Sequence, residues 1–277
     1  MTESTSVLER LRANGGGLSV AGQRIAEVVR VDPSAVIGMS VSDLAGESGT
    51  SVGSVVRFCQ ELGLRGFQEL KLRLAGEVSA AAGEVPRTDQ PLPTRVLLET
   101  AASLHQAATA IDPAAFAHAT DLLAGARRVL VAGVGTSAPV AADAAYRLTL
   151  AGVATTWVSD VHGQHVCAAM LTPADVCLTI SHTGQTQESL AITSSAREAG
   201  AATIGLSSFA RSPLAQVCDV TIVAGSAETG FRIEAMTSRF VHLAVVDALY
   251  VALAERHPER SSKAQARALE VLARHRL

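Results

Sequence analysis

The feature that most constrains the fold of this 277-residue chain is an alternation of short apolar runs and helical patterns that begins near residue 128. The apolar runs have the length of strands, and the segments between them repeat apolar residues at helical spacing. We expect strands at residues 128–132, 154–158, 176–180, 203–206 and 220–223, and helices at residues 138–151, 164–170, 187–199 and 237–257. This alternation predicts an α/β domain with a parallel sheet flanked by helices, whose ligands bind beyond the carboxyl ends of the strands.

The composition of the chain excludes several classes of protein. Hydrophobic residues make up 48% of the sequence and aromatic residues only 3%, so the core must be aliphatic. The net charge of −3 excludes a protein that is basic throughout, although a local patch is enough to contact DNA phosphates. The sequence shows no secretory signal pattern and no apolar run of about 18 residues, which predicts a cytoplasmic protein without a membrane partner.

The residues that could bind a metal are scattered along the chain. The four cysteines form no CxxC pair, which favours free buried thiols over a redox or metal role. His162 and His165 have a spacing that could seat zinc, but no third ligand is evident nearby, and polar helix surfaces often hold such pairs. We therefore expect neither a metal nor a cofactor.

The segment from residue 20 to about residue 75 shows only helical patterns, which predicts an all-α N-terminal domain. Ser40 and Asp43 have the spacing of a capping box at the start of a short helix. Gly49 breaks that helix, and Ser51 is placed to cap another one directly after it. Two short helices joined by a glycine turn indicate a helix-turn-helix.

The second helix of this pair supplies the candidates for reading DNA. Its buried face is expected to consist of Val52, Val55, Val56, Cys59 and Leu62. The candidates for contacting DNA are its polar residues and the basic residues that follow: Ser51, Ser54, Arg57, Gln60, Arg65 and Lys71. The alternative is an ordinary helical bundle in which Arg57 is only a solvated charge.

Residues 42–74 closely resemble the N-terminal helix-turn-helix of the RpiR/MurR family of bacterial transcriptional regulators. The residues that carry the resemblance are Leu44-Ala45, Ser51, Val55-Val56-Arg57-Phe58, Leu62-Gly63-Leu64, Gly66-Phe67 and Leu70-Lys71. The sequence departs from the family pattern at Thr50, where an apolar residue is usual, and at Gly53, where a better helix former is common. Glycine in a helix costs up to about 1 kcal/mol. The resemblance implies that this segment binds operator DNA.

The residues that join the two halves of the chain, 76–93, lose hydrophobic periodicity and gather proline, glycine and charge. This pattern is typical of a linker or a frayed helix end. We expect a helix-turn-helix domain at residues 1–77, a linker at 78–94 and the α/β domain at 95–277.

Two loops of the α/β half carry small polar residues directly after an expected strand. Residues 133–137 (GVGTS) follow the first strand, and residues 181–186 (SHTGQT) follow the third. Hydroxyls and free N–H groups at a helix N-terminus form an anion site, so both loops are candidates for gripping a phosphate. The first loop also matches the start of a dinucleotide fingerprint, but its third glycine is absent and no acid ends the next strand. A tight turn with a simple serine N-cap is a further alternative for that loop.

The pairing of these two loops resembles the SIS domain, the sugar-isomerase fold that binds phosphosugars. Thr183 stands where that family usually has serine, which keeps the hydroxyl. Glu234 has three interpretations: a proton-transferring base, a ligand for a sugar hydroxyl, or an acid at a helix N-terminus. The ligand-binding residues that the resemblance implies are Gly135, Ser137, Ser181, Thr183, Gly184, Gln185, Thr186, Ser207 and Glu234.

Together, the two resemblances imply a DNA-binding transcriptional regulator of sugar or amino-sugar metabolism whose SIS domain senses a phosphosugar effector. We expect a homodimer or homotetramer, because paired DNA half-sites are read by paired helices. The competing possibility is a phosphosugar isomerase or etherase of the SIS superfamily. The helix-turn-helix pattern decides against an enzyme, because a free-standing isomerase has no use for it.

Overall fold

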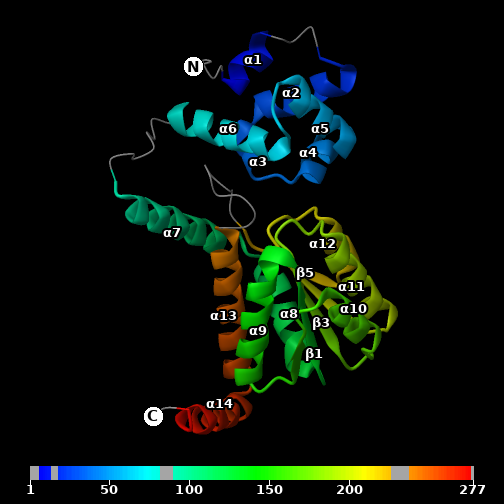
Figure 1. The fold of residues 1–277 in the computed structure, drawn as a ribbon, viewed down its shortest axis with the longest axis vertical. Helices are drawn as coiled ribbons and strands as arrows, with labels where there is room; N and C mark the ends of the chain where they lie inside the picture. Colours follow the sequence, from blue (N-terminus) through cyan, green and yellow to red (C-terminus); the bar gives the residue numbers. More distant parts are fainter. Residues whose placement is uncertain (1–5, 14–17, 82–89, 226–236, 276–277) are drawn as a thin grey trace. The chain divides into compact units, whose positions relative to one another are not determined.

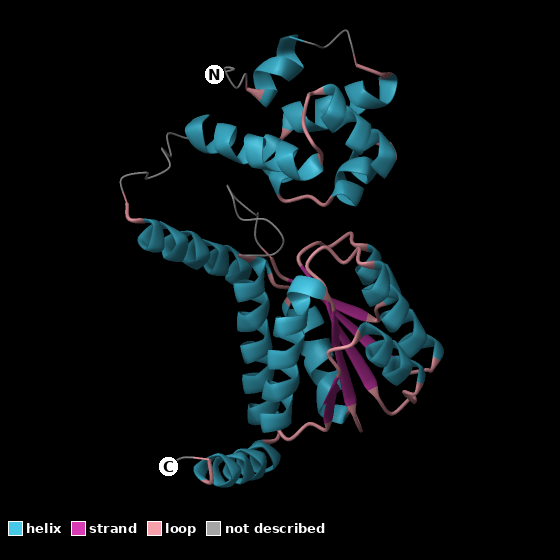
Figure 2. Cartoon of the chain, viewed as in Figure 1, coloured by secondary structure: helices cyan, strands magenta, loops and turns pink. Residues whose placement is uncertain are grey.

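Figures 1 and 2 show the computed structural model of the chain, which describes residues 6–13, 18–81, 90–225 and 237–275. The described residues group into two compact units that divide between Ala101 and Ala102. The linker expected at residues 78–94 falls partly on residues 82–89, which lie outside the described ranges. The helices on either side of that gap end at Ala81 and begin at Leu92.

The N-terminal unit contains six helices in its described residues before the gap (Figure 1). Each of them contributes buried side chains to one aliphatic core, in which Phe58 is the largest fully buried residue. Their bounds are α1 (Val7–Ala13), α2 (Val20–Val31), α3 (Pro33–Ile37), α4 (Val41–Glu47), α5 (Val52–Glu61) and α6 (Phe67–Ala81).

The helix-turn-helix pair forms where its capping residues predict. The Asp43 N–H donates to Ser40 Oγ at 3.1 Å, and the Ser40 N–H donates to the Asp43 carboxylate at 2.8 Å, so the predicted capping box is present at the start of α4. Gly49 turns the chain with a φ of 61°, a conformation in which a side chain is strained. Ser51 then caps α5 by accepting from the Ser54 N–H at 3.2 Å. These three local signals define the turn.

The buried face of α5 differs from the expected one. Val55, Phe58 and Cys59 are buried, whereas the side chains of Val52 and Val56 are 42% and 37% exposed. At about 100° per residue, the buried positions form one stripe, and Val56 lies roughly a quarter-turn or more away from its centre. The placement of Val52 and Val56 in the core was therefore wrong, because the buried stripe extends to Phe58, on the side of Val55 away from these two valines.

The C-terminal unit is built on five parallel strands in the order β2-β1-β3-β4-β5. All five were predicted from the apolar runs, two of them with the observed ends and three with ends that differ by one residue. The strands are β1 (Val129–Gly133), β2 (Thr155–Trp157), β3 (Val176–Ile180), β4 (Ala202–Ser207) and β5 (Val220–Val223). This topology confirms the predicted parallel sheet flanked by helices.

Helices cover both faces of this sheet (Figures 1 and 2). On one face, α8, α9 and α13 pack against β1, β2 and β5 or against one another, and on the other face α10, α11 and α12 pack against β1, β3 and β4. The helical elements of the described residues after the gap are α7 (Leu92–Ala110), α8 (Pro113–Gly125), the 3-10 turn η1 (Gly135–Ser137), α9 (Ala138–Leu150), α10 (Val161–Ala169), α11 (Gln187–Glu198), α12 (Pro213–Val217), α13 (Ser238–Arg256) and α14 (Pro258–Ala273).

The strands alternate their side chains between two cores. Val129 and Val131 join the core beneath α8, α9 and α13, whereas Leu130 and Ala132 join the core beneath α10 and α11. Because both faces are covered, the strands read as continuous apolar runs and not as alternating ones. Among the helices of the described ranges, none is both long and apolar enough to cross a membrane.

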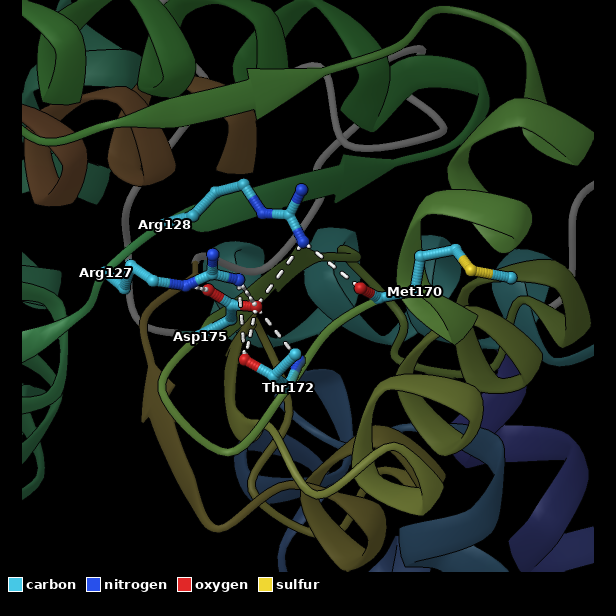
Figure 3. A network of polar contacts seen from close by, with 5 residues as sticks. All are labelled: Arg127, Arg128, Met170, Thr172 and Asp175. Atoms are coloured by element: carbon cyan, nitrogen blue, oxygen red, sulfur yellow. Dashed lines mark hydrogen bonds and ion pairs between the residues drawn. The ribbon is translucent and has the colours of Figure 1, made fainter.

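A buried carboxylate ties the starts of β1 and β3 together (Figure 3). The Asp175 carboxylate accepts from Arg127 at 2.8 and 3.0 Å, from the Thr172 N–H and hydroxyl at 2.9 Å each, and from Arg128 at 3.4 Å. Arg128 also donates to the Met170 carbonyl at 3.2 Å. Burial raises the pKa of Asp175, but the hydrogen bonds from Arg127 and Thr172 outweigh that effect and lower the pKa to about 2. This network connects the amino-terminal ends of β1 and β3. It lies at the end of the sheet opposite the predicted loops.

Candidate functional site

The two predicted phosphate loops leave the sheet from adjacent strands. β1 and β3 pair in parallel with Gly133 opposite Ile180, so the loops that follow them begin side by side. In the order β2-β1-β3-β4-β5, the chain moves outward in opposite directions from β1 and β3. Ligands of parallel α/β sheets bind at such a switch point, beyond the carboxyl ends of the strands.

The loop after β1 is shaped by close packing and leaves one serine hydroxyl without a partner among the described residues. Gly133 bonds in both directions to the buried Gln164 side chain, at 3.1 and 3.2 Å, and a Cβ on Gly133 would lie 2.8 Å from that of Ala141. Gly135 turns the chain with a φ of 59°. Ser137 precedes α9 but makes no capping bond, and its hydroxyl engages none of the described residues. The alternative of a simple serine N-cap is therefore wrong.

The loop after β3 contributes a second such hydroxyl. Ser181 is buried, and its hydroxyl contacts no partner within the described part of the chain. Thr183 Oγ1 accepts from the Gln185 N–H at 3.2 Å, which shapes the loop from within. Gly184 has a φ of 61°, and a Cβ there would lie 2.5 Å from Ser212. Thr186 precedes α11 without capping it, so its side chain leaves the first N–H groups of that helix free to face an anion.

A chain of hydrogen bonds behind this loop fixes the orientation of His182. Its Nδ1 lies 2.8 Å from Ser208 Oγ, which lies 3.2 Å from His242 Nε2, and that nitrogen lies 2.8 Å from the Ala224 carbonyl. Burial lowers the pKa of His242 to about 4, so its ring is neutral at neutral pH. Because the carbonyl can only accept, His242 Nε2 carries the proton. Ser208 can then donate to His182 Nδ1, which places the proton of a neutral His182 ring on Nε2.

Two of the residues in this site were not identified from the sequence. Gln164 and His242 lie at ordinary positions of helices, and no local pattern distinguishes them. The one sign that could have identified them is a polar side chain on the apolar face of a helix, because such a side chain must find a hydrogen-bond partner once it is buried. Both residues do so, on Gly133 and on the Ala224 carbonyl.

Two predicted ligand residues have a different status in the structure. Ser207 is fully buried, and its hydroxyl donates to the His182 carbonyl and accepts from the Phe209 N–H. It supports the loop from the interior, and its role as a ligand contact stays a prediction. Glu234 lies outside the described residues. Gly135 is exposed at the first loop, and Gln185 and Thr186 are half-buried at the second.

The DNA-contact candidates lie on or near α5 with one exception. Ser51, Arg57 and Gln60 are exposed, and Ser54 is half-buried. Lys71 is only 4% exposed, and its ammonium donates to the Met39 carbonyl at 2.9 Å. Its position one turn into α6 directs it at the end of α3, so it does not face solvent as expected.

The basic residues after α5 are partly neutralised. Glu69 accepts from Arg65 Nε at 3.1 Å and from Arg73 Nη2 at 2.9 Å. Hydrogen bonds from the Arg65 N–H, from Arg73 and from the Arg65 side chain lower the pKa of Glu69 to about 2, so it stays charged. Among the candidates, Arg57 is thus the exposed cation on the α5 surface itself.

No metal site is formed by the residues that the structure describes, since no three metal-binding side chains gather among them. His165 Nε2 instead lies 2.8 Å from Ser195 Oγ. All four cysteines are free, and burial raises the pKa of Cys59 to about 12 and that of Cys177 to about 11, which keeps both as unreactive thiols.

A helix-turn-helix unit joined to an α/β unit with two hydroxyl-rich loops at its switch point defines the class: a transcriptional regulator with a sugar-isomerase-type domain. The model of the helix-turn-helix domain of the rpiR family matches residues 5–81, and the model of the SIS domain matches residues 122–252. The chain belongs to the RpiR family of helix-turn-helix transcriptional regulators.

Relatives of known sequence and structure match nearly the whole chain. An HTH-type transcriptional regulator of Thermotoga maritima is 31% identical over 282 residues, covering 98% of this chain and 97% of that protein. The HTH-type transcriptional regulator HexR of Pseudomonas aeruginosa is 33% identical over 250 residues, covering 88% and 87%. The NanR protein of Vibrio vulnificus, solved in complex with ManNAc-6P, superposes with a TM-score of 0.77 at 25% identity, covering 97% of this chain and 98% of that one.

Proposed function

We propose that this chain binds operator DNA as a regulator of sugar or amino-sugar metabolism and that its SIS domain binds a phosphosugar effector. The observation that carries the proposal is the pair of hydroxyls on Ser137 and Ser181, which no described residue engages and which start from adjacent strands at the switch point. NanR was solved with ManNAc-6P, and this likeness supports a phosphorylated hexose or hexosamine as the class of effector.

The proposed roles in effector binding follow from the chemistry of each group. Ser137 and Ser181 hydroxyls donate to the phosphate, and the uncapped N-terminus of α11 at Thr186 adds N–H donors and the favourable end of the helix dipole. Gln185 and the exposed Gly135 line the rim, where the sugar hydroxyls would be read. Glu234 is kept as a proposed sugar ligand.

The proposed roles in DNA binding belong to the N-terminal unit. Arg57 and Gln60 on α5 face the operator, Ser51 and Ser54 contact its backbone, and Arg65 adds a phosphate contact at the edge. We place DNA binding within residues 1–77 and effector binding within residues 95–277, joined by the linker at 78–94. A homodimer or homotetramer would present paired α5 helices to paired half-sites.

The proposal is tested by thermal unfolding of the full chain in the presence of hexose and N-acetylhexosamine 6-phosphates, beginning with ManNAc-6P. A ligand at one hundred times its Kd stabilises the native state by about 2.7 kcal/mol. This corresponds to a rise in Tm of roughly 5–10 °C for a domain of this size. Ser181→Ala should abolish the rise, whereas Ser262→Ala, an exposed serine on α14, should leave it unchanged. A full rise in Ser181→Ala would contradict the assigned site.

A turnover assay distinguishes the proposed sensor from an enzyme of the same fold. A sensor binds its effector and releases it unchanged, whereas an isomerase or etherase of the same fold would convert it. The presence of a helix-turn-helix unit favours the sensor. If the sugar phosphate that raises the Tm is recovered unchanged after prolonged incubation with the protein, the sensor proposal stands. Conversion at enzymatic rates would overturn it.

A further inference from the structure

The outward surface of α5 contains an aliphatic row that the fold does not use. We define the exposed α5 face as Val52, Gly53, Val56, Arg57 and Gln60, all of which are exposed. Val55, Phe58 and Cys59, on the other side of the helix, supply the whole buried stripe. The core of the N-terminal unit is therefore complete without Val52 and Val56.

The geometry of the helix sorts this face into two rows. Val52, Val56 and Gln60 are spaced by four residues and form one continuous row, because side chains four apart lie one above the other. Gly53 and Arg57 form the neighbouring row. A Cβ on Gly53 would meet only Ser51 Oγ, at 3.8 Å. Because Gly53 has no side chain, the helix surface is lower between the valines and the N-terminal turn. The valine row is thus accessible to a surface that approaches α5 closely.

The chemistry of the two rows matches the major groove of DNA. Arginine and glutamine donate to phosphates and to base edges, whereas an aliphatic group recognises the C5-methyl of thymine, the apolar mark that the groove displays. We propose that Val52 and Val56 determine sequence specificity by packing against thymine methyl groups in the operator. This inference rests on the proposed DNA-binding function and assigns it two further contact residues.

The test removes single methyl groups from the DNA. The full-length chain first selects its preferred duplex from a randomised library long enough for two half-sites. Each thymine of that duplex is then replaced in turn by deoxyuridine, which lacks only the methyl, and binding is measured by fluorescence anisotropy. Loss of one buried methyl is worth about 0.8 kcal/mol, so binding should weaken about fourfold at the contacted thymines.

The protein variants identify which valine reads which methyl. Val56→Ala and Val52→Ala should bind the selected duplex more weakly, and each should lose the deoxyuridine effect at the thymine it contacts. Val31→Ala is the matched control, because Val31 is a 74% exposed valine at the C-terminal end of α2 and is no part of the exposed α5 face. It should keep the full effect. Because these valines are exposed, all three variants should melt at the temperature of the unmodified chain.

The outcomes distinguish this inference from the function on which it rests. If no duplex is enriched by the full-length chain, the proposed DNA binding itself fails. If a duplex is enriched and bound but no thymine-to-deoxyuridine change weakens binding, only the role of the valines is refuted. The same conclusion follows if the deoxyuridine effect persists unchanged in both valine variants.

Discussion

At the scale of single residues, the chain stabilises buried charge with several partners at once. Asp175 is the clearest case, because its carboxylate has no exposed surface and accepts from two arginines and from Thr172 (Figure 3). Removing one member of such a buried group leaves the others unpaired, which costs far more than breaking an exposed pair. Exposed ion pairs, such as the one between Arg147 and Asp247 at 3.5 Å, contribute little.

We predict that Asp175→Asn lowers the free energy of unfolding by about 2–4 kcal/mol at pH 7, because the buried carboxylate is lost. Asp247→Asn is the control and should cost less than about 1 kcal/mol. The pKa of Asp175 is lowered to about 2, so its stabilisation is complete above the ordinary carboxyl value and is lost as the pH falls toward 2. Urea unfolding at pH 7 and near pH 3 checks this: the gap between the two proteins should narrow at the lower pH. A constant gap would contradict the assignment.

His242 should produce a second, separate dependence on pH. Burial lowers its pKa from 6.5 to about 4, so the unfolded chain binds a proton more readily than the folded one. The stabilisation from the neutral ring is therefore complete above pH 6.5 and is lost as the pH falls toward 4, by about 3 kcal/mol in total. His242→Gln keeps a donor for the Ala224 carbonyl but does not titrate. Its stability should stay level between pH 7 and 5, where that of the unmodified chain declines; parallel curves would contradict this.

At the scale of elements, the loops of the site depend on backbone conformation. Gly184 and Gly135 both have a positive φ, but their surroundings differ. A Cβ at Gly184 would lie 2.5 Å from Ser212, whereas a Cβ at Gly135 would have no described atom within 4 Å. Gly135→Ala should therefore cost about 1 kcal/mol from strain alone, and Gly184→Ala about 3 kcal/mol or more. Thermal unfolding measures both. Equal losses would show that packing against Ser212 does not shape the second loop.

The elements also show what the sequence could predict. The five strands, the capping box at Ser40 and the cap at Ser51 depend on neighbours in the sequence, and all were predicted. The burial of Lys71 and Ser207 and the exposure of the two α5 valines were not predicted, because the surroundings of these side chains are set by residues distant in the chain. Lys71 meets the Met39 carbonyl, 32 residues away, and Ser207 meets the His182 carbonyl, 25 residues away. No local pattern reports such a contact.

The same distinction holds within the candidate site. The two loops were predicted because glycine and hydroxyl residues after an apolar run indicate a strand end facing a ligand. Their adjacency depends on the strand order, in which β1 and β3 are neighbours, and no local pattern reveals that order. The hydrogen bonds by which Gln164, Ser208 and His242 support the loops could not be predicted from the sequence. They form where α10, the end of β4 and α13 meet the loops.

At the scale of the whole molecule, the proposed function requires free energy to pass between two units. An effector can change operator affinity only if it binds the DNA-competent and DNA-incompetent arrangements with different affinity. A coupling free energy of about 1–3 kcal/mol changes affinity roughly 5- to 150-fold. Linkage requires that operator DNA change the effector affinity by the same factor, which gives an internal check on any measured coupling.

The central claim is that the β1 and β3 loops control DNA binding by α5, and operator affinity of the full chain with and without the effector tests it most directly. Anisotropy titration of the selected duplex should show a shift of at least fivefold when the effector is saturating. Ser181→Ala should bind the duplex normally and show no shift, whereas Arg57→Ala should lose DNA binding while keeping its Tm rise with effector. An undiminished shift in Ser181→Ala, or joint loss of both activities in Arg57→Ala, would contradict the account.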